Sequence, residues 1–367
     1  MVSSTAAARA ARAWVPLAVV LVISTLALGS VLVRRRHEAP TLSMLSRCEK
    51  MRRSRSRNHK YFPAACRRSP LFHFDSVLHT RLTPPPPSRR GVLRSEVGAD
   101  WLPGAPPPPL TATPPDDLRA FSMAQHAEDV YAHEHFFFAP PAPLRRRVVL
   151  ESGALDGVVF SVSNALESQL GWRALHIEAG PGKFERLARN RPRALNLHTA
   201  LCDSPRELHF LQKDFTDSVG GIAEFMSPAF LRTFWPDVDL ASIDRHPDAT
   251  RISCAPLASL LALFNVQHVD LWVLDVEGAE LAVLQTVDFG AVNIDVIVAE
   301  LDGSDPAKDR GVWDLLIAHG YDVYATTKGG SGQREDNTWF VRRAALSSLS
   351  KKQGVPQPGP PLQPQPH

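Results

Sequence analysis

The second half of the chain alternates short apolar runs with segments whose apolar positions recur at helical spacing. Short, fully apolar runs separated by amphipathic helices are typical of parallel strands that are covered on both faces. The pattern therefore predicts an α/β fold built on a doubly wound, mostly parallel sheet. The runs expected as strands lie at 148–151, 174–178, 195–202, 270–276, 294–301, 321–326 and 337–343.

The sequence before this block contains one segment suited to a membrane. Residues 14–33 are apolar or small and carry no charge. As a helix, a run of that length rises about 30 Å, which matches the hydrocarbon core of a bilayer. We therefore expect an N-terminal tail at 1–13 and a transmembrane anchor at 14–33. An organelle transit peptide is the alternative, because residues 1–37 contain Ala, Ser and Arg but neither Asp nor Glu.

Proline separates the folded part from its appendages. The chain has 32 prolines, and they gather before residue 121 and in the C-terminal tail. Proline runs lack backbone donors and favour extended conformations, so they indicate linkers. The predicted order is a basic, Pro-rich disordered linker at 34–120, a domain at 121–345 and a Pro/Gln-rich disordered tail at 346–367.

Positive charge is concentrated in the linker. The net charge is only +3, yet residues 34–68 carry twelve Lys and Arg residues against two Glu. This block suits anionic lipid headgroups as well as it suits a solvated linker. It lacks aromatic residues at a regular spacing, so we do not expect nucleic-acid binding.

Acidic residues end five of the predicted strands. In open α/β sheets, ligands bind at the carboxyl ends of the strands. A carboxylate placed there caps a helix, is solvated or binds a ligand, and five on one sheet favour a ligand site. The five acids are Glu151, Glu178, Asp203, Asp275 and Glu300.

The loop after the first strand, ESGALDG at 151–157, has glycines suited to a close backbone approach. Gly153 and Gly157 allow positive φ angles, and Asp156 lies between them. The third glycine of a dinucleotide loop is missing, and no Lys or Arg occurs between residues 151 and 172, so we do not expect a diphosphate. Glu178 ends the second strand, where an acid accepts hydrogen bonds from ribose hydroxyls. A ribose without a diphosphate indicates S-adenosylmethionine.

Several motifs are similar to one known family. The series comprises FSMAQHAEDVY, ESGALDG, SVSNALE, LHIEAGPGKFERLARNRP, LDVEGAELAVL, VIVAEL and NTWF. In this order, over residues 121–343, they resemble the FkbM-type methyltransferase domain. The resemblance implies a Rossmann-like fold of the class I methyltransferase type, an S-adenosylmethionine cofactor and, typically, O-methylation.

The same resemblance assigns roles to individual residues. It implies that Glu151, Gly153 and Gly157 line the cofactor loop, that Glu178 binds the ribose and that Asp203 lies beside the adenine. Ser152 and Leu155 depart from the residues that family members often have in this loop.

The segment LDVEGAEL supplies the candidate catalytic residues. Transfer to a hydroxyl benefits from a base that takes its proton, and Asp275 is the candidate, with Glu300 on the neighbouring strand as its partner. Glu277 would share a face with Asp275 if the strand continued that far. Glu280 suits a structural role at a helix N-terminus. No residue is assigned as a dedicated metal ligand, although these oxygens could hold a hard cation such as magnesium.

A long insertion at 214–251 shows no clear periodicity. Such lengths often form a lid or an acceptor-binding wall. Its aromatic residues would either stack on a sugar or pack the insertion onto the domain; they are Phe225, Phe230, Phe234 and Trp235.

The four cysteines do not have the spacing of a structural zinc site. Cys202 and Cys254 fall on strand-like segments, where a buried free thiol is the commoner case. In a lumenal domain the two could instead form a disulfide.

Two functional hypotheses follow. The first is a membrane-anchored, S-adenosylmethionine-dependent methyltransferase that O-methylates a glycan or similar acceptor in the endoplasmic reticulum or Golgi. The second is a catalytically silent protein of secretory-pathway trafficking, because the layout also resembles that of the protein Star. The intact loop and acids favour the first. The basic block after residue 33 would by itself keep the domain cytosolic, in conflict with a lumenal location.

Overall fold

The computed structural model describes residues 94–101, 117–141, 145–213, 220–301, 303–327 and 337–358. The predicted tail at 1–13, the predicted anchor at 14–33 and most of the predicted linker lie outside these ranges. Within them, no helix combines the length and apolar character needed to cross a bilayer.

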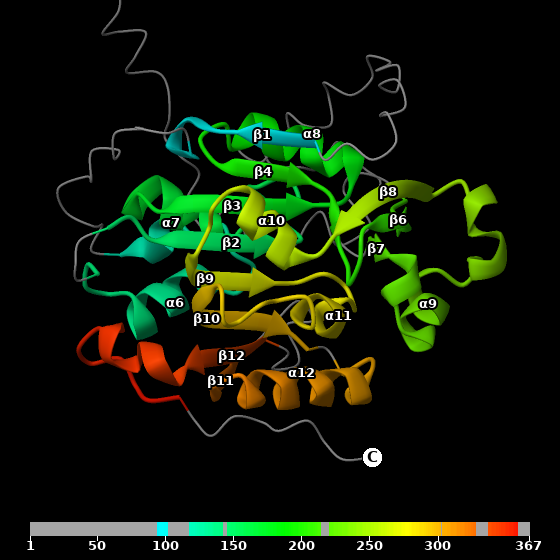
Figure 1. Cartoon of the computed structure of the whole chain (residues 1–367). Helices are drawn as coiled ribbons and strands as arrows, with labels where there is room; N and C mark the ends of the chain where they lie inside the picture. Colours follow the sequence, from blue (N-terminus) through cyan, green and yellow to red (C-terminus); the bar gives the residue numbers. More distant parts are fainter. Residues whose placement is uncertain are drawn as a thin grey trace, which may run out of the picture. The chain divides into compact units, whose positions relative to one another are not determined.

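The core of the described domain is an eight-stranded sheet with the order β1-β4-β3-β2-β9-β10-β12-β11 (Figure 1). The five central strands, from β4 to β10, are parallel. β1 and β12 run antiparallel to their inner neighbours, and β11 pairs antiparallel with β12. The predicted doubly wound, mostly parallel sheet is confirmed. The bounds are β1 Arg94–Val97, β2 Val148–Ser152, β3 Arg173–Glu178, β4 Leu195–His198, β9 His268–Leu274, β10 Asn293–Glu300, β11 Tyr321–Thr327 and β12 Asn337–Arg342.

Helices cover both faces of this sheet because alternate strand residues point to opposite sides. Val148 and Leu150 belong to the hydrophobic cluster that includes α10 (Leu257–Leu263), α11 (Glu280–Leu284) and α12 (Pro306–Ala318). Val149, between them, belongs to the cluster of α6 (Glu128–Phe136) and α7 (Ser163–Leu170). α8 (Pro181–Asn190) packs through Phe184 and Leu187 on Ala154 of the glycine loop.

Local sequence explains where two of the helices begin. Asp305 caps α12 by accepting the Lys308 N–H at 3.1 Å, and Pro306 occupies the first turn. Ser227 caps α9 (Pro228–Phe234) in the same way. An N-cap oxygen satisfies a backbone donor that the helix leaves unpaired, and proline there loses no hydrogen bond.

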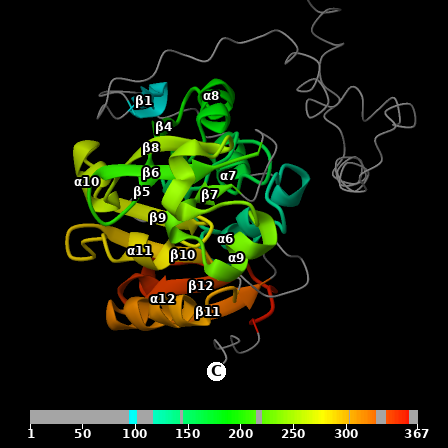
Figure 2. The same ribbon diagram turned by 90° about the vertical axis from the view of Figure 1, so that its right-hand side faces the viewer.

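A second, four-stranded sheet with the order β5-β8-β6-β7 lies beyond the carboxyl ends of the central strands (Figures 1 and 2). The predicted strand at 195–202 is therefore wrong as a single element, because β4 and β5 belong to different sheets. The chain leaves the main sheet at Thr199, whose hydroxyl donates to the Ser253 carbonyl of β8 at 2.9 Å. The bounds are β5 Ala200–Leu201, β6 Arg206–Leu211, β7 Gly221–Ile222 and β8 Ala249–Ala255.

The insertion expected at 214–251 contributes regular structure to this second sheet. It supplies β7, η4 (Ala223–Phe225), α9, η5 (Leu240–Arg245) and the start of β8. Trp235 and Phe230 are buried in a cluster with Leu211, Met226 and Ile243. Packing therefore accounts for these two aromatic residues, whereas Phe234 is exposed.

The domain extends beyond both predicted boundaries. β1 pairs with β4, and the Trp101 indole donates to the Ala174 carbonyl at 2.9 Å, so ordered structure begins before residue 121. At the other end, the Ser350 N–H donates to the Phe136 carbonyl, and Lys352 pairs with Glu134 at 2.9 Å. Parts of the predicted linker and tail thus belong to the folded domain.

Cys202 and Cys254 form a disulfide between the segment after β5 and strand β8. The expectation of free thiols is wrong, and the alternative pairing is correct. Both residues belong to the buried cluster of the second sheet. The bond closes a loop over a sequence separation of 52 residues, which restricts the unfolded chain.

Replacing both cysteines should destabilise the second sheet. For Cys202→Ser with Cys254→Ser, we expect the free energy of unfolding to fall by about 2–4 kcal/mol, because the loop closure is lost. Chemical denaturation of the double variant and of the reduced wild type would measure this. Equal stability of the oxidised and reduced wild type would contradict the disulfide.

Candidate functional site

In the glycine loop after β2, several backbone N–H groups donate to acceptors in the loop itself or in β3. The N–H groups of Gly153 and Ala154 both donate to the Ile177 carbonyl, and the Gly157 N–H donates to the Ala154 carbonyl. The Leu155 N–H donates to Glu178 Oε2 at 2.8 Å. A phosphate-binding loop needs such donors free to face an anion. In this conformation they are used within the loop and by β3, as expected for a site without a diphosphate.

Both predicted glycines are required by the backbone. Gly153 has φ +83°, and a Cβ there would lie 1.9 Å from the carbonyl oxygen of Asp275. Gly157 has φ +74°, and a Cβ there would meet Leu187 and Arg191 of the α8 region. The glycines thus allow the loop to lie directly against the end of β9, beside the candidate base.

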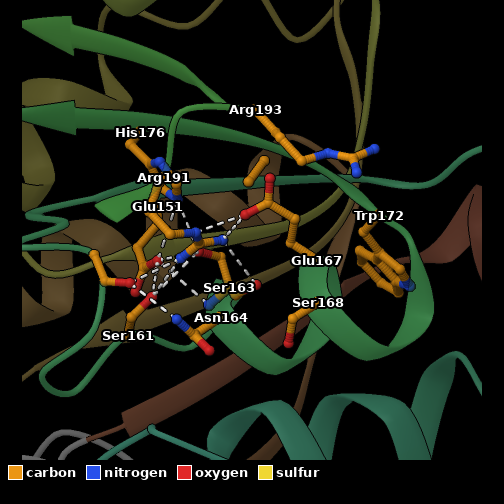
Figure 3. Close-up of polar contacts among 12 residues, drawn as sticks. Glu151, Ser161, Ser163, Asn164, Glu167, Ser168, Trp172, His176, Arg191 and Arg193 are labelled. Atoms are coloured by element: carbon orange, nitrogen blue, oxygen red, sulfur yellow. Dashed lines mark hydrogen bonds and ion pairs between the residues drawn. The ribbon is translucent and has the colours of Figure 1, made fainter. Parts of the chain in front are cut away.

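Glu151 lies in a buried polar network (Figure 3). Its carboxylate accepts the Val162 N–H at 2.8 Å and the Ser161 and Ser163 hydroxyls at 2.9 and 2.5 Å. Arg191 joins the same network through the Ser161 and Ser163 hydroxyls. In this conformation the carboxylate fixes the turn into α7. Its predicted part in lining the cofactor loop stays a prediction.

Two other predicted cofactor residues also have local partners. Asp156 Oδ1 accepts the N–H groups of Val158 and Val159 at 2.9 and 2.8 Å and so closes the turn after the loop. Asp203 is exposed, follows β5 of the second sheet and pairs with Arg206. The position beside an adenine that the family resemblance implies for Asp203 stays a prediction.

Glu178 ends β3 as expected but is buried. Its two oxygens accept N–H groups from Leu155 and Gly180, at 2.8 and 2.7 Å. Burial raises the pKa of Glu178, while the nearby Lys183 charge and these donors act in the opposite direction. In this conformation Glu178 holds the glycine loop and is buried, so contact with a ribose requires neighbouring groups to move.

Two polar residues beside Glu178 were not predicted from the sequence. The Gln212 side-chain oxygen is buried and has no hydrogen-bond partner among the residues that the structure describes. A Cβ at Gly180 would lie 2.7 Å from that oxygen and 2.9 Å from Glu178 Oε1, so the two acceptors border the same small space. Lys183 is also buried, with its ammonium group 5.6 Å from the Phe210 ring centre. Buried polar atoms without partners are uncommon in proteins and indicate a site that a ligand or water completes.

Asp275 and Glu300 lie together at the carboxyl ends of β9 and β10. Leu274 and Ala299, which precede them, are partners in the strand register, and the two carboxyl groups share a hydrogen bond. Burial, and then the charges of Glu300 and Glu277, raise the pKa of Asp275 well above its ordinary value. Asp275 is nevertheless exposed to solvent. The pair that the sequence predicted is therefore brought together.

Glu277 and Glu280 have different surroundings. β9 ends at Leu274 and Glu277 has φ +53°, so the strand does not continue as far as Glu277 and the condition for sharing a face with Asp275 is not met. Glu280 is buried, accepts the Val276 and Gly278 N–H groups and pairs with Lys308 at 2.8 Å. These contacts confirm its structural role.

A pocket opens beside these acids. The insertion forms one wall through Phe225, Ser227 and Phe230. The loop after β9 and the start of α12 form the remainder, with Glu277, Gly278, Glu280, Glu300, Ser304, Asp305 and Lys308. Of the four aromatic residues of the insertion that were expected to stack or to pack, Phe225 and Phe230 thus face the pocket.

One group of side chains lies close enough together to hold a metal ion, but it is not the group of acids after β9. Among the described residues, His268, Asp270 and Asp295 form such a group, with ligand atoms within 4.8 Å of one another. Arg145 pairs with Asp270, and Arg342 pairs with Asp295, each at 2.7 Å. The arginines balance these carboxylates. The acids after β9 do not form such a group, so the geometry gives no support to the expected magnesium.

The Glu151 network yields a stability prediction. In Glu151→Ala the serine hydroxyls and backbone donors lose their acceptor, so the free energy of unfolding should fall by roughly 3–5 kcal/mol. Asp314→Ala, on the exposed side of α12, is the control and should be nearly neutral. Thermal denaturation of both variants would test this. A Glu151→Ala protein as stable as the control would show that the network is not required.

One known family is similar to part of the chain. Residues 151–323 match the family described as methyltransferase FkbM domain. No curated protein sequence matches the chain.

Three solved methyltransferase structures resemble the fold only distantly. A TehB-like SAM-dependent methyltransferase from Corynebacterium glutamicum is 12% identical, with a TM-score of 0.30 over 60% of this chain and 89% of that one. A ribosomal protein L11 methylase from Lactobacillus delbrueckii is 11% identical (TM-score 0.27; 57% and 73% covered). A precorrin-6y C5,15-methyltransferase from Geobacter metallireducens is 15% identical (0.26; 54% and 80%). Residues 151–323 are similar to the methyltransferase FkbM domain family, which supports a methyltransferase domain in this chain.

Proposed function

We propose that this protein is an S-adenosylmethionine-dependent methyltransferase that methylates a hydroxyl oxygen. The observation that carries the proposal is the Asp275–Glu300 pair, which lies at the carboxyl edge of the sheet beside the pocket of a methyltransferase domain. Transfer to a hydroxyl leaves a proton on the acceptor oxygen, and a carboxylate at this place can take it.

The residues around the glycine loop fit the cofactor in part. Gly153 and Gly157 allow a close approach, and the Gln212 oxygen and the Lys183 ammonium lie near Glu178 as groups for a ribose and an adenine. When bound, S-adenosylmethionine supplies a methyl group activated by its sulfonium. Glu178 is buried, so the fit requires neighbouring groups to make room for a ribose, whose hydroxyls can use the lone pairs that the Leu155 and Gly180 N–H groups leave free.

The acid pair suits proton transfer. Because the pKa of Asp275 is raised, its carboxylate is a stronger base than an ordinary aspartate. Glu300 holds the Asp275 side chain through their shared hydrogen bond. Turnover should therefore rise with pH as Asp275 loses its proton.

We also propose a glycan or similar polyhydroxyl acceptor in the endoplasmic reticulum or Golgi. Phe225 and Phe230 offer apolar ring surface, and Glu277 and Glu300 can accept hydrogen bonds from hydroxyl groups. The Cys202–Cys254 disulfide supports an oxidising compartment. A membrane anchor at 14–33 remains part of this proposal, with the domain on the lumenal side.

A catalytically silent role in secretory-pathway trafficking is the second candidate. The observation that favours it is the closed state of the Glu178 site, where Leu155 and Gly180 use both carboxylate oxygens. Cofactor binding separates the two candidates.

Calorimetry of the full chain with S-adenosylmethionine tests the first candidate directly. We expect saturable binding, and Asp275→Asn should retain it while losing about 10²–10⁴-fold in turnover. Asp314→Asn serves as the matched control and should keep both properties. Absence of binding would reject the enzyme and favour the silent protein, whereas an active Asp275→Asn would remove this residue from the mechanism.

Membrane topology needs its own measurement. If the domain is lumenal, the C-terminal region should resist added protease in sealed microsomes and become sensitive once detergent opens them. Digestion in the intact vesicles would place the domain on the cytosolic side, as the basic block after residue 33 suggests.

A further inference from the structure

The pocket wall that contains Phe225 and Phe230 packs against the loop after β9 through close backbone contacts. A Cβ at Gly278 would lie 2.9 Å from the Phe225 carbonyl oxygen, and one at Gly221 would lie 2.8 Å from the Glu277 Cβ. β7 and η4 therefore rest directly on the segment that carries the pocket acids. A change in the position of η4 changes the pocket.

A histidine on the second sheet holds η4 from the other side. The His209 backbone N–H donates to the Glu224 carboxylate of η4, and His209 Nδ1 lies 2.7 Å from Glu224 Oε1. The other ring nitrogen, Nε2, lies 2.8 Å from Asp244 Oδ1 of η5. One imidazole thus bridges two separate segments of the insertion.

This geometry depends on protonation. A neutral imidazole carries a single N–H and can donate to one carboxylate only, whereas the imidazolium can donate to both. Deprotonation leaves a ring lone pair facing a carboxylate oxygen, which is repulsive. The bridge as a whole is therefore complete only when His209 is charged.

The surrounding charges act in the same direction. Arg251 of β8 pairs with Asp244 at 2.7 Å and with Glu207 of β6 at 3.3 Å. With Glu224, this gives three carboxylates against one arginine, and a charged His209 reduces the imbalance. Partial burial alone would lower the pKa of His209, but its bonds to Asp244 and Glu224 outweigh that effect and raise it.

We propose that His209 is a pH-dependent clamp on the acceptor pocket, closed when the imidazole is protonated and linking η4 to η5. The direction of the pH dependence follows from the difference between the pKa of His209 in the folded and in the unfolded chain. The stabilisation is fully present below the pKa of an unfolded histidine, about 6.5, and is lost as the pH rises through the higher pKa of the folded state. The pocket wall is then ordered in mildly acidic surroundings and loosens in alkaline ones. Only the consequence for the acceptor rests on the proposed function.

Hydrogen exchange of the full chain tests the clamp without any activity. After correction for the intrinsic pH dependence of exchange, amides in 221–234 should exchange about threefold to fivefold faster at pH 8 than at pH 5.5, the size expected for partly exposed ion pairs. His209→Gln should exchange fast at both pH values. His246→Gln is the matched control, because His246 faces a single carboxylate, that of Asp237 at 3.4 Å, and it should keep the wild-type transition.

A second variant covers the case in which His209→Gln does not fold. Glu224→Gln keeps an oxygen for the His209 N–H but removes one charge, so the His209 resonance in a histidine NMR titration should move to a lower pKa. A pH-independent wild type, a transition that persists in His209→Gln, or a titration unchanged by Glu224→Gln would each overturn the clamp.

The effect of the clamp on acceptor binding is tested in a separate experiment that measures the KM for the acceptor. If the protein is a methyltransferase, the KM for the acceptor should rise with pH in the wild type and not in His209→Gln, while the KM for S-adenosylmethionine stays constant. Failure of cofactor binding rejects the proposed function and leaves the exchange result standing. An acceptor KM with the same pH dependence in both proteins would overturn the link between clamp and pocket.

Discussion

The arrangement of the site depends on backbone segments that touch without side chains between them. Gly153 lies against the Asp275 carbonyl, and Gly278 lies against the Phe225 carbonyl. The first contact joins the glycine loop to the end of β9, and the second joins the end of β9 to the insertion. A Cβ at either place would overlap backbone atoms, which cannot move without displacing a strand. The candidate cofactor loop, the acid pair and the pocket wall are thus fixed relative to one another by two glycines.

Carboxylates near the ends of the central strands divide into two groups by their partners. Glu151 and Glu280 have their oxygens used by hydroxyls, backbone N–H groups or a lysine, and these contacts hold turns in place. Asp275 and Glu300 instead face each other. Carboxylates that share a proton are costly to keep together unless the site uses them, because each disfavours ionisation of the other. This difference is why we propose Asp275 and Glu300, and not Glu151 or Glu280, for proton transfer.

The features that indicate a cell compartment lie in the second sheet and its insertion. It carries the Cys202–Cys254 disulfide and the His209 bridge, and its insertion supplies Phe225 to the pocket. A disulfide persists in an oxidising compartment, and a histidine between two carboxylates responds to mild acidity. Both properties suit the secretory pathway that we propose, and they arise from residues outside the central sheet.

The sequence alone determined the central sheet, the two glycines and the pairing of Asp275 with Glu300. Apolar periodicity is a local pattern, and it places each of these acids at the carboxyl end of a predicted strand. Tertiary structure decided the rest. Glu151 and Glu178 both end strands, yet only their neighbours show that one anchors α7 and the other holds the glycine loop. The strand predicted at 195–202 divides between two sheets because Thr199 bonds to a strand more than fifty residues away. Gln212, the disulfide and the two partners of His209 depend on contacts between distant segments, which no local pattern encodes.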